Sequence, residues 1–255
     1  MRMIATVLGA LLLLSGCGGG GDDPGAEGVA SPGSSDSRTR ALASGQPLFD
    51  SQALVYIAGY PDLIRAFGLD LDAARLHWET YGRAEGRGFI FDADAYMAAN
   101  PELIASLNGD IEAAARHYIS QGFAEGRSTS FDGLSYTASY EDLTLQYGLN
   151  RWAATRHYVD FGWREGRTIP FKPLLYTASY PDLIAAFGVD EVNAVGHYLR
   201  YGHAEGRRVT FDAPQYLINH PDVAAQVGTT PEAAARHYIT TGYALGWTDR
   251  SGGPP

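Results

Sequence analysis

Apolar and polar positions repeat along most of this chain with a spacing of forty residues. The clearest copy of the pattern runs from His117 to Arg127 and reads HYISQGFAEGR. Self-similarity at a fixed period in this range is typical of a repeat array. The histidines that begin the corresponding runs are His77, His117, His157, His197 and His237. We therefore divide the chain into five repeats, which span residues 49–90, 91–130, 131–170, 171–210 and 211–250.

The second repeat illustrates the helices that the pattern predicts. Asp92 is a good N-cap for a first helix. Pro101, with a carboxylate after it, is expected at the start of a second helix, and Asn108 at its end, because asparagine tolerates left-handed geometry. A third helix is expected to begin after Asp110 and to continue for about eleven residues to Gly122.

The third predicted helix also shows which side of the repeat is buried. Ile111, Ala114, Tyr118 and Ile119 have helical spacing, and the alternation of period two that strands require is absent. One such repeat cannot bury its apolar face alone, so neighbouring repeats must stack. The prediction is an all-α fold of five tandem three-helix repeats, stacked as a short α-solenoid or superhelix and preceded by a disordered tether.

The amino-terminal residues have the features of an export signal. An apolar run from Ile4 to Leu14 follows Arg2 and is too short to cross a bilayer as a helix. The small residues before Cys17, the only cysteine, resemble the lipobox of bacterial lipoproteins. This resemblance implies a signal peptide of residues 1–16, cleavage before Cys17, and acylation of its thiol and amine. An ordinary signal peptide with a cysteine nearby by chance is the alternative.

Residues 17–48 are rich in glycine, serine, alanine, proline and aspartate. Such a segment cannot bury enough apolar surface to fold, so we expect a disordered linker there, and another disordered tail at residues 251–255. No later stretch approaches transmembrane length, so the acyl chains on Cys17 are the expected contact with the membrane. By resemblance to lipoprotein sorting, Gly18 after the cysteine implies the outer membrane of the cell envelope.

The charge of the chain argues against two classes of partner. The sequence has 19 basic and 29 acidic residues, for a formal net charge of −10 at pH 7. An acidic chain is a poor ligand for nucleic acid or for anionic lipid. We therefore expect no nucleic-acid partner.

The repeated motif, with Phe-Asp, Tyr, Pro-Asp-Leu, His-Tyr, Gly and Glu-Gly-Arg in order, resembles a repeat of bacterial secreted and surface proteins. Similar stretches are appended to some bacterial glycosyltransferases and to calcium-binding, hemolysin-like exported proteins. The resemblance covers residues 49–250 and implies an accessory or interaction module at the cell envelope. It carries no catalytic residue to this chain, and the aspartate-rich nonapeptides that bind calcium in hemolysin-like proteins do not occur.

Acidic and basic residues end four of the repeats. The fifth repeat has Leu245, Gly246 and Trp247 where the others have Glu-Gly-Arg, and it has no successor. We therefore expect each Glu–Arg pair to bridge its repeat to the next. The pairs are Glu85 and Arg87, Glu125 and Arg127, Glu165 and Arg167, and Glu205 and Arg207.

The five repeated histidines could suggest a metal site or a catalytic site. A metal ion needs several ligands around one point, whereas equivalent residues on stacked helices are about 8–10 Å apart. Catalysis needs one asymmetric arrangement, and these histidines recur with the same neighbours. We therefore predict structural histidines that each satisfy a buried backbone or tyrosine group, with no metal, cofactor or catalytic residue.

The position after the glycine that ends the third helix varies more than its neighbours. A row of rings there could grip a sugar or a peptide, since exposed clusters of this kind mark interaction sites. The alternative, which we favour, is that the rings fill gaps between repeats. The five residues of this candidate binding edge are Arg83, Phe123, Trp163, His203 and Tyr243.

Together these features predict a non-enzymatic, lipid-anchored envelope protein whose helical repeats bind an unidentified protein or polysaccharide. A hydrolase acting on glycan or cell wall is an alternative, as is a purely structural spacer. A unique polar pocket would favour the hydrolase. An open aromatic edge would favour binding, and a uniformly polar surface the spacer.

Overall fold

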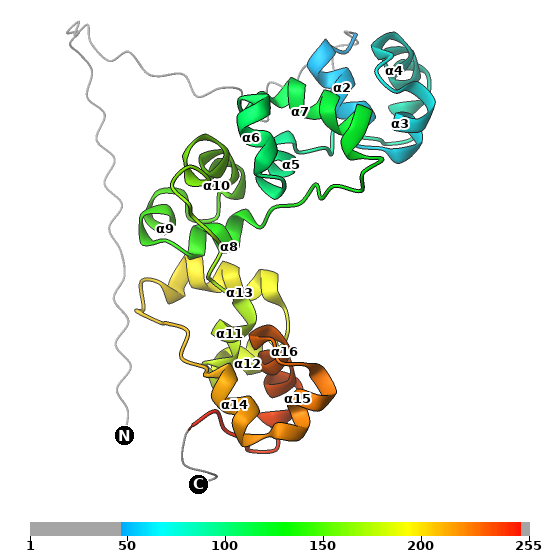
Figure 1. Cartoon of the computed structure of the whole chain (residues 1–255). Coiled ribbons are helices and arrows are strands. Elements are labelled where there is room, and N and C mark those ends of the chain that lie inside the picture. Colours follow the sequence, from blue (N-terminus) through cyan, green and yellow to red (C-terminus); the bar gives the residue numbers. More distant parts are fainter. Residues whose placement is uncertain (1–46, 251–255) are drawn as a thin grey trace, which may run out of the picture. The chain divides into compact units, whose positions relative to one another are not determined.

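The computed structural model describes residues 47–250 (Figure 1). The predicted signal peptide, Cys17, nearly all of the predicted linker and the short tail lie outside these residues. The described chain is helical and has no strand, which confirms the predicted all-α class. None of its helices is long and apolar enough to cross a membrane.

Each repeat contains three short α-helices, as predicted. In the first two repeats they are α2 (Asp50–Ala58), α3 (Pro61–Phe67), α4 (Leu71–His77), α5 (Ala93–Ala99), α6 (Glu102–Leu107) and α7 (Ile111–His117). In the third and fourth they are α8 (Gly133–Ala138), α9 (Glu141–Tyr147), α10 (Arg151–His157), α11 (Pro173–Ala178), α12 (Pro181–Phe187) and α13 (Glu191–His197). In the fifth they are α14 (Ala213–Asn219), α15 (Pro221–Val227) and α16 (Pro231–His237).

The predicted caps explain where the third helices begin. The Asp110 carboxylate accepts a hydrogen bond from the Ala113 backbone N–H, which would otherwise have no partner inside the helix. The same bond is made by the residue that precedes each of the other third helices. At the end of α6, Asn108 has a φ of 51°, the left-handed geometry expected of that position. These boundaries are decided by residues a few positions apart.

The third helix differs from the expected continuous α-helix. After seven residues it becomes a five-residue π-helix, the form in which an N–H bonds to the carbonyl five positions earlier. In the third repeat, for example, the Trp163 N–H donates to the Tyr158 carbonyl at 3.1 Å. The five π-helices are η1 (Trp78–Gly82), η2 (Tyr118–Gly122), η3 (Tyr158–Gly162), η4 (Tyr198–Gly202) and η5 (Tyr238–Gly242).

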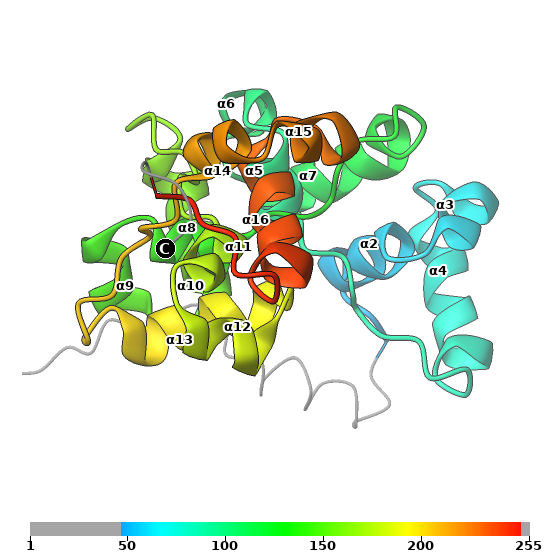
Figure 2. The same cartoon turned by 90° about the horizontal axis from the view of Figure 1, so that it is seen from below.

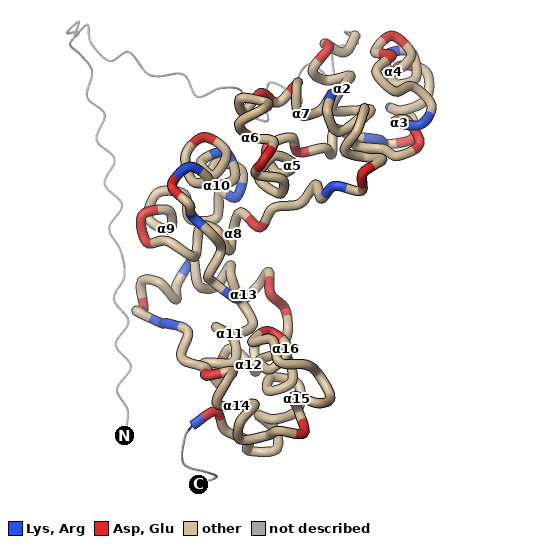
Figure 3. Tube along the Cα trace, viewed as in Figure 1, with Lys and Arg blue, Asp and Glu red and all other residues tan. Residues whose placement is uncertain are grey.

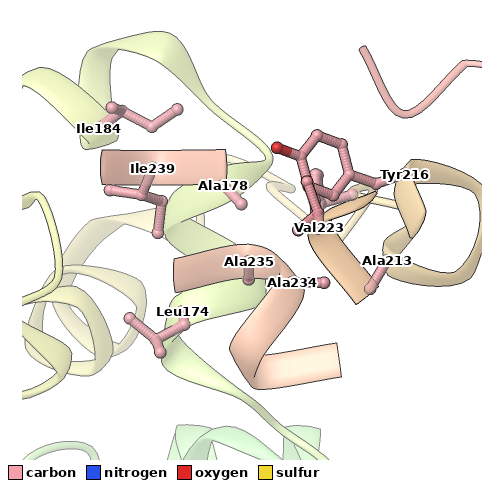
Figure 4. Packing of buried hydrophobic residues seen from close by; sticks show 10 residues of the cluster. Leu174, Ala178, Ile184, Ala213, Tyr216, Val223, Ala234, Ala235 and Ile239 are labelled. Atoms are coloured by element: carbon pink, nitrogen blue, oxygen red, sulfur yellow. The ribbon is translucent and has the colours of Figure 1, made fainter. Parts of the chain in front are cut away.

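Neighbouring repeats pack by one rule. The first helix of a repeat contacts the third helix of the next repeat, so that α2 packs on α7, α5 on α10, α8 on α13 and α11 on α16. Both ribbon views show α16 beside α11 (Figures 1 and 2). At this last junction Leu174 and Ala178 of α11 share a buried cluster with Ala235 and Ile239 of the fifth repeat (Figure 4). Ala235 of α16 and Ile239 of η5 therefore make this contact between repeats, whereas Ile111, which we expected in the buried stripe, is 39% exposed.

Candidate functional site

A tyrosine–histidine pair lies at the centre of every repeat. The tyrosine comes from the first helix and is completely buried, and its hydroxyl lies 2.8–3.0 Å from Nδ1 of the histidine that ends the third helix. Two helices that are separate in the sequence are thereby joined by one hydrogen bond. The pairs are Tyr56 with His77, Tyr96 with His117, Tyr136 with His157, Tyr176 with His197 and Tyr216 with His237.

The protonation of these pairs follows from their burial. Burial raises the pKa of Tyr56, Tyr96 and Tyr216 to about 12, so the tyrosine keeps its proton and donates it. Burial also lowers the pKa of His157, which favours the neutral ring. A neutral imidazole that accepts at Nδ1 carries its proton on Nε2. In the third repeat the pair of Tyr136 and His157 is thus a neutral hydrogen bond suited to holding two helices together.

The tyrosine hydroxyl also explains the glycine at the end of each π-helix. A Cβ atom built on Gly162 would lie well inside 3.0 Å from the Tyr136 hydroxyl oxygen, and the other four repeats have the same geometry. Only glycine therefore lets the backbone come this close to the buried ring. The predicted helix-stop glycine has a second role that depends on a residue from another helix.

The Glu–Arg pairs lie within single repeats, whereas we expected them to bridge neighbours. Arg167 bonds Glu165 through Nε at 2.5 Å and Asp142 on α9 through Nη2 at 2.9 Å. Both partners belong to the third repeat, and the bond from Arg167 lowers the pKa of Asp142. The corresponding arginines are Arg87, which pairs with Asp62, Arg127, which pairs with Glu102, and Arg207, which pairs with Asp182. The arginine closes its own repeat because the terminal turn folds back over the second helix.

Three repeats present an exposed aromatic ring beside the central histidine. In the third repeat the His157 ring lies between Tyr147 and Phe161, with centroid distances of 5.7 Å and 5.6 Å. Phe161 is 57% exposed although it is a large apolar side chain. The first repeat has the same arrangement at Phe67, His77 and Tyr81, and the fourth has it at Phe187, His197 and Tyr201. We call these three groups the aromatic–histidine clusters.

The sequence reasoning missed these clusters, although a signal was present. Their exposed rings lie four residues after the histidine, one helical turn further on, where the second repeat has Gln121 and the fifth has Thr241. An aromatic residue at this outward position in some repeats only is not explained by packing that all repeats share. The clusters are therefore the part of the repeat surface that most strongly indicates a specific function.

The five residues of the predicted binding edge differ in exposure and in what they contact. Phe123 is partly buried, and the Arg65 guanidinium of the preceding repeat lies 5.0 Å from its ring centroid. Trp163 is partly buried, and its Nε1 is shielded from solvent with no hydrogen-bond partner among the described residues. His203 is partly buried against Tyr198, whereas Tyr243 is 40% exposed. Arg83 is exposed and lies over the Trp78 ring.

The fifth repeat has an open cavity beside His237, with Val227 at the position of Phe67 and Phe187. It measures about 440 Å³ and is lined by Val227, Glu232, Ala233, Arg236, His237 and Thr240. Its three ionisable groups already have partners: Glu232 pairs with Lys172, Arg236 with Glu191, and His237 with the Tyr216 hydroxyl. Within residues 47–250 no group of three histidine, cysteine or carboxylate side chains is placed to hold a metal ion. Figure 3 shows acidic and basic residues interspersed along the repeats.

Comparison with family models, with curated proteins and with solved structures found no match to this chain.

Proposed function

We propose that the protein is a non-enzymatic, lipid-anchored component of the bacterial cell envelope whose helical repeats form an interaction scaffold for a protein or polysaccharide. The membrane part of the proposal rests on the lipobox-like residues before Cys17. The scaffold part rests on the aromatic–histidine clusters. One observation carries it: Tyr81, Phe161 and Tyr201 are 58%, 57% and 56% exposed at the same position of three repeats.

Exposed rings held in place are suited to binding. Removing a large aromatic side chain from water is among the strongest contributions to an interface, and aromatic residues are enriched at interaction hot spots. Each exposed ring is fixed against a histidine that is itself hydrogen bonded to a buried tyrosine. Little side-chain entropy is therefore lost on binding. Three equivalent clusters on one chain also allow a repetitive partner to bind at more than one point, which raises its avidity.

Two observations make the scaffold a better account than the alternatives. A hydrolase would use polar groups in a pocket, and those around the cavity beside His237 are paired within the protein. A spacer would have a uniformly polar surface, whereas Phe161 and its equivalents present rings to solvent.

The test compares substitutions at one position of different repeats. The full chain carrying Tyr81→Ala, Phe161→Ala and Tyr201→Ala is compared with one carrying Gln121→Ala and Thr241→Ala, the same position without rings. Binding is measured by cosedimentation with cell-wall polysaccharide and by crosslinking to envelope proteins. Loss of about 1.4 kcal/mol lowers affinity tenfold, so removing three rings should weaken binding by at least that factor. Two outcomes would refute the scaffold. One is equal binding by the two variants, and the other is no binding to polysaccharide or to envelope protein. Mass spectrometry of the mature amino terminus tests acylation of Cys17 separately.

A further inference from the structure

The four junctions between neighbouring repeats are built from equivalent residues, so they can be compared with one another. Each packs the first helix of one repeat on the third helix of the next. At the fourth junction, between the fourth and fifth repeats, Leu174 and Ile239 share one buried cluster and are 2% and 8% exposed. The third junction, between the third and fourth repeats, has apolar residues at both positions but covers them less.

The leucines of the third junction are incompletely buried. Leu134 and Leu199 occupy these two positions, and both are partly buried against the cluster that contains Val195. At the first two junctions the equivalents of Leu199 are Ile119 and Val159, which are 6% and 2% exposed. The favourable free energy of an apolar contact is roughly proportional to the area that it removes from water. The third junction is therefore stabilised less by burial than the fourth.

Each of the other three junctions also has a charged contact between its two repeats. The contacts are Arg65 with the ring of Phe123, Arg156 with Asp94, Lys172 with Glu232, and Arg236 with Glu191. Within residues 47–250, no ion pair or cation–π contact joins the third repeat to the fourth. Where the fourth junction has the pair of Lys172 and Glu232, the third has Asp132 and Val192, which are both exposed. The third junction thus lacks the charged contacts that hold the other neighbours in one orientation.

Gly196 accounts for one of the missing contacts. It lies in α13 at the position of Arg156 and Arg236, whose guanidiniums reach the preceding repeat. A Cβ atom at Gly196 would have one near neighbour, Arg200 Nη1 at 3.5 Å, so packing does not require glycine there. Glycine inside a helix leaves the backbone more conformations than any other residue does. The helix that the fourth repeat brings to this junction is therefore unanchored and more easily deformed.

Two of the aromatic–histidine clusters, those around His157 and His197, lie on either side of the third junction. A change of angle at this junction changes the distance between them. We propose that the third junction is a hinge, the joint at which the repeat array bends. The hinge itself follows from packing alone. Its use, which is to adapt the spacing of two neighbouring clusters to a partner, rests on the proposed function.

Distances between spin labels on the full chain test the hinge. Gln146→Cys with Ala186→Cys places labels at the same exposed position on both sides of the third junction, and Ala186→Cys with Gln226→Cys does so for the fourth. Cys17→Ser in both chains restricts the labels to these sites. Double electron–electron resonance should give a distance distribution about twice as wide, or wider, across the third junction. Equal widths, or a wider distribution across the fourth junction, would overturn the hinge.

The ion pair of Glu191 with Arg236 can be rebuilt at the third junction, which tests the cause of the bending. Its equivalents there are Arg151 and Gly196. The double variant Arg151→Glu, Gly196→Arg should narrow the distribution across the third junction to the width of the fourth, whereas Arg151→Glu alone should leave it wide. Arg236→Gly should widen the distribution across the fourth junction, which does not depend on how the rebuilt variant folds. Widths that stay the same in both directions would show that these contacts do not set the hinge.

Cosedimentation of the same variants with cell-wall polysaccharide separates the hinge from its use. The rebuilt double variant should bind about threefold more weakly than Arg151→Glu alone, because its two clusters are held at one spacing. Equal binding by the two would overturn the adaptation of spacing. If neither the wild-type chain nor any variant binds, the proposed function fails and the use of the hinge fails with it. The spin-label distances decide the hinge in either case.

Discussion

Replacing Tyr136 with phenylalanine and Gly162 with alanine, singly and together, tests whether the buried hydroxyl requires glycine in the π-helix. Tyr136→Phe removes a hydroxyl that lies 3.0 Å from His157 Nδ1. The histidine is partly exposed, so water replaces some of the lost bond, and the free energy of unfolding should fall by about 1 kcal/mol. Gly162→Ala places a methyl group against the same hydroxyl and should cost about 2–3 kcal/mol through overpacking.

The double variant should be more stable than the sum of these losses predicts. Without the hydroxyl, the nearest atoms to the alanine Cβ are Cδ2 of Tyr158 at 3.1 Å and Cζ of the ring at position 136 at 3.2 Å. Small shifts can accommodate both contacts. Alanine is also favoured over glycine in a helix by up to about 1 kcal/mol. We therefore expect a coupling free energy of about 1–2 kcal/mol between the two sites.

The assay is urea unfolding of the full chain, followed by far-ultraviolet circular dichroism. Gly166→Ala is not a suitable control, because Gly166 has a φ of 69° and alanine would be strained there. The control is therefore the same pair of substitutions at Tyr176 and Gly202 of the fourth repeat. Both cycles should give the same sign of coupling. Strictly additive losses in both would refute the idea that the hydroxyl and the glycine are fitted to each other.

Other consequences of the structure can be measured in the same way. Burial raises the pKa of Tyr56 to about 12, so its contribution to stability is complete below pH 10 and is lost as the pH rises toward 12. Absorbance of tyrosinate should therefore rise with unfolding, and titration of every tyrosine near pH 10 in the folded protein would contradict this. Arg167→Ala removes bonds to Asp142 and a ring contact at 4.7 Å, and should cost about 1–2 kcal/mol in urea unfolding, against less than about 0.5 for the exposed Arg200→Ala. Ala138→Ile overfills a junction and should cost about 1–3 kcal/mol, and a neutral result would show that this junction tolerates the residue found at 218.

Local features of the fold could be predicted because they depend on residues close together in the sequence. The cap at Asp110 and the left-handed Asn108 each involve one turn of backbone, and both lie where the pattern placed them. The role of histidine as a partner for a buried group was also predicted. A backbone group and a tyrosine were both left open as its partner, and the packing of two separate helices decides for the Tyr136 hydroxyl at His157.

Choices between partners were harder to predict. Arg167 has several carboxylates within reach of its side chain, and the sequence pattern suggested one in the next repeat. The path of the terminal turn, which returns over α9, brings it to Asp142 of its own repeat. In the same way, rings at positions such as Trp163 and Phe161 look alike in the sequence, but only Phe161 is left largely exposed when the chain folds.

The sequence alone determined the number of repeats, their helical class and most helix boundaries. Periodicity and capping are local properties, and the same pattern recurs in each repeat. Tertiary structure alone decided which surfaces remain open. Exposure is the outcome of packing between segments far apart in the chain, and two residues with the same polarity pattern differ once a neighbouring helix covers one of them. The exposed Ile218, at the position where Ala178 is buried, is the clearest case.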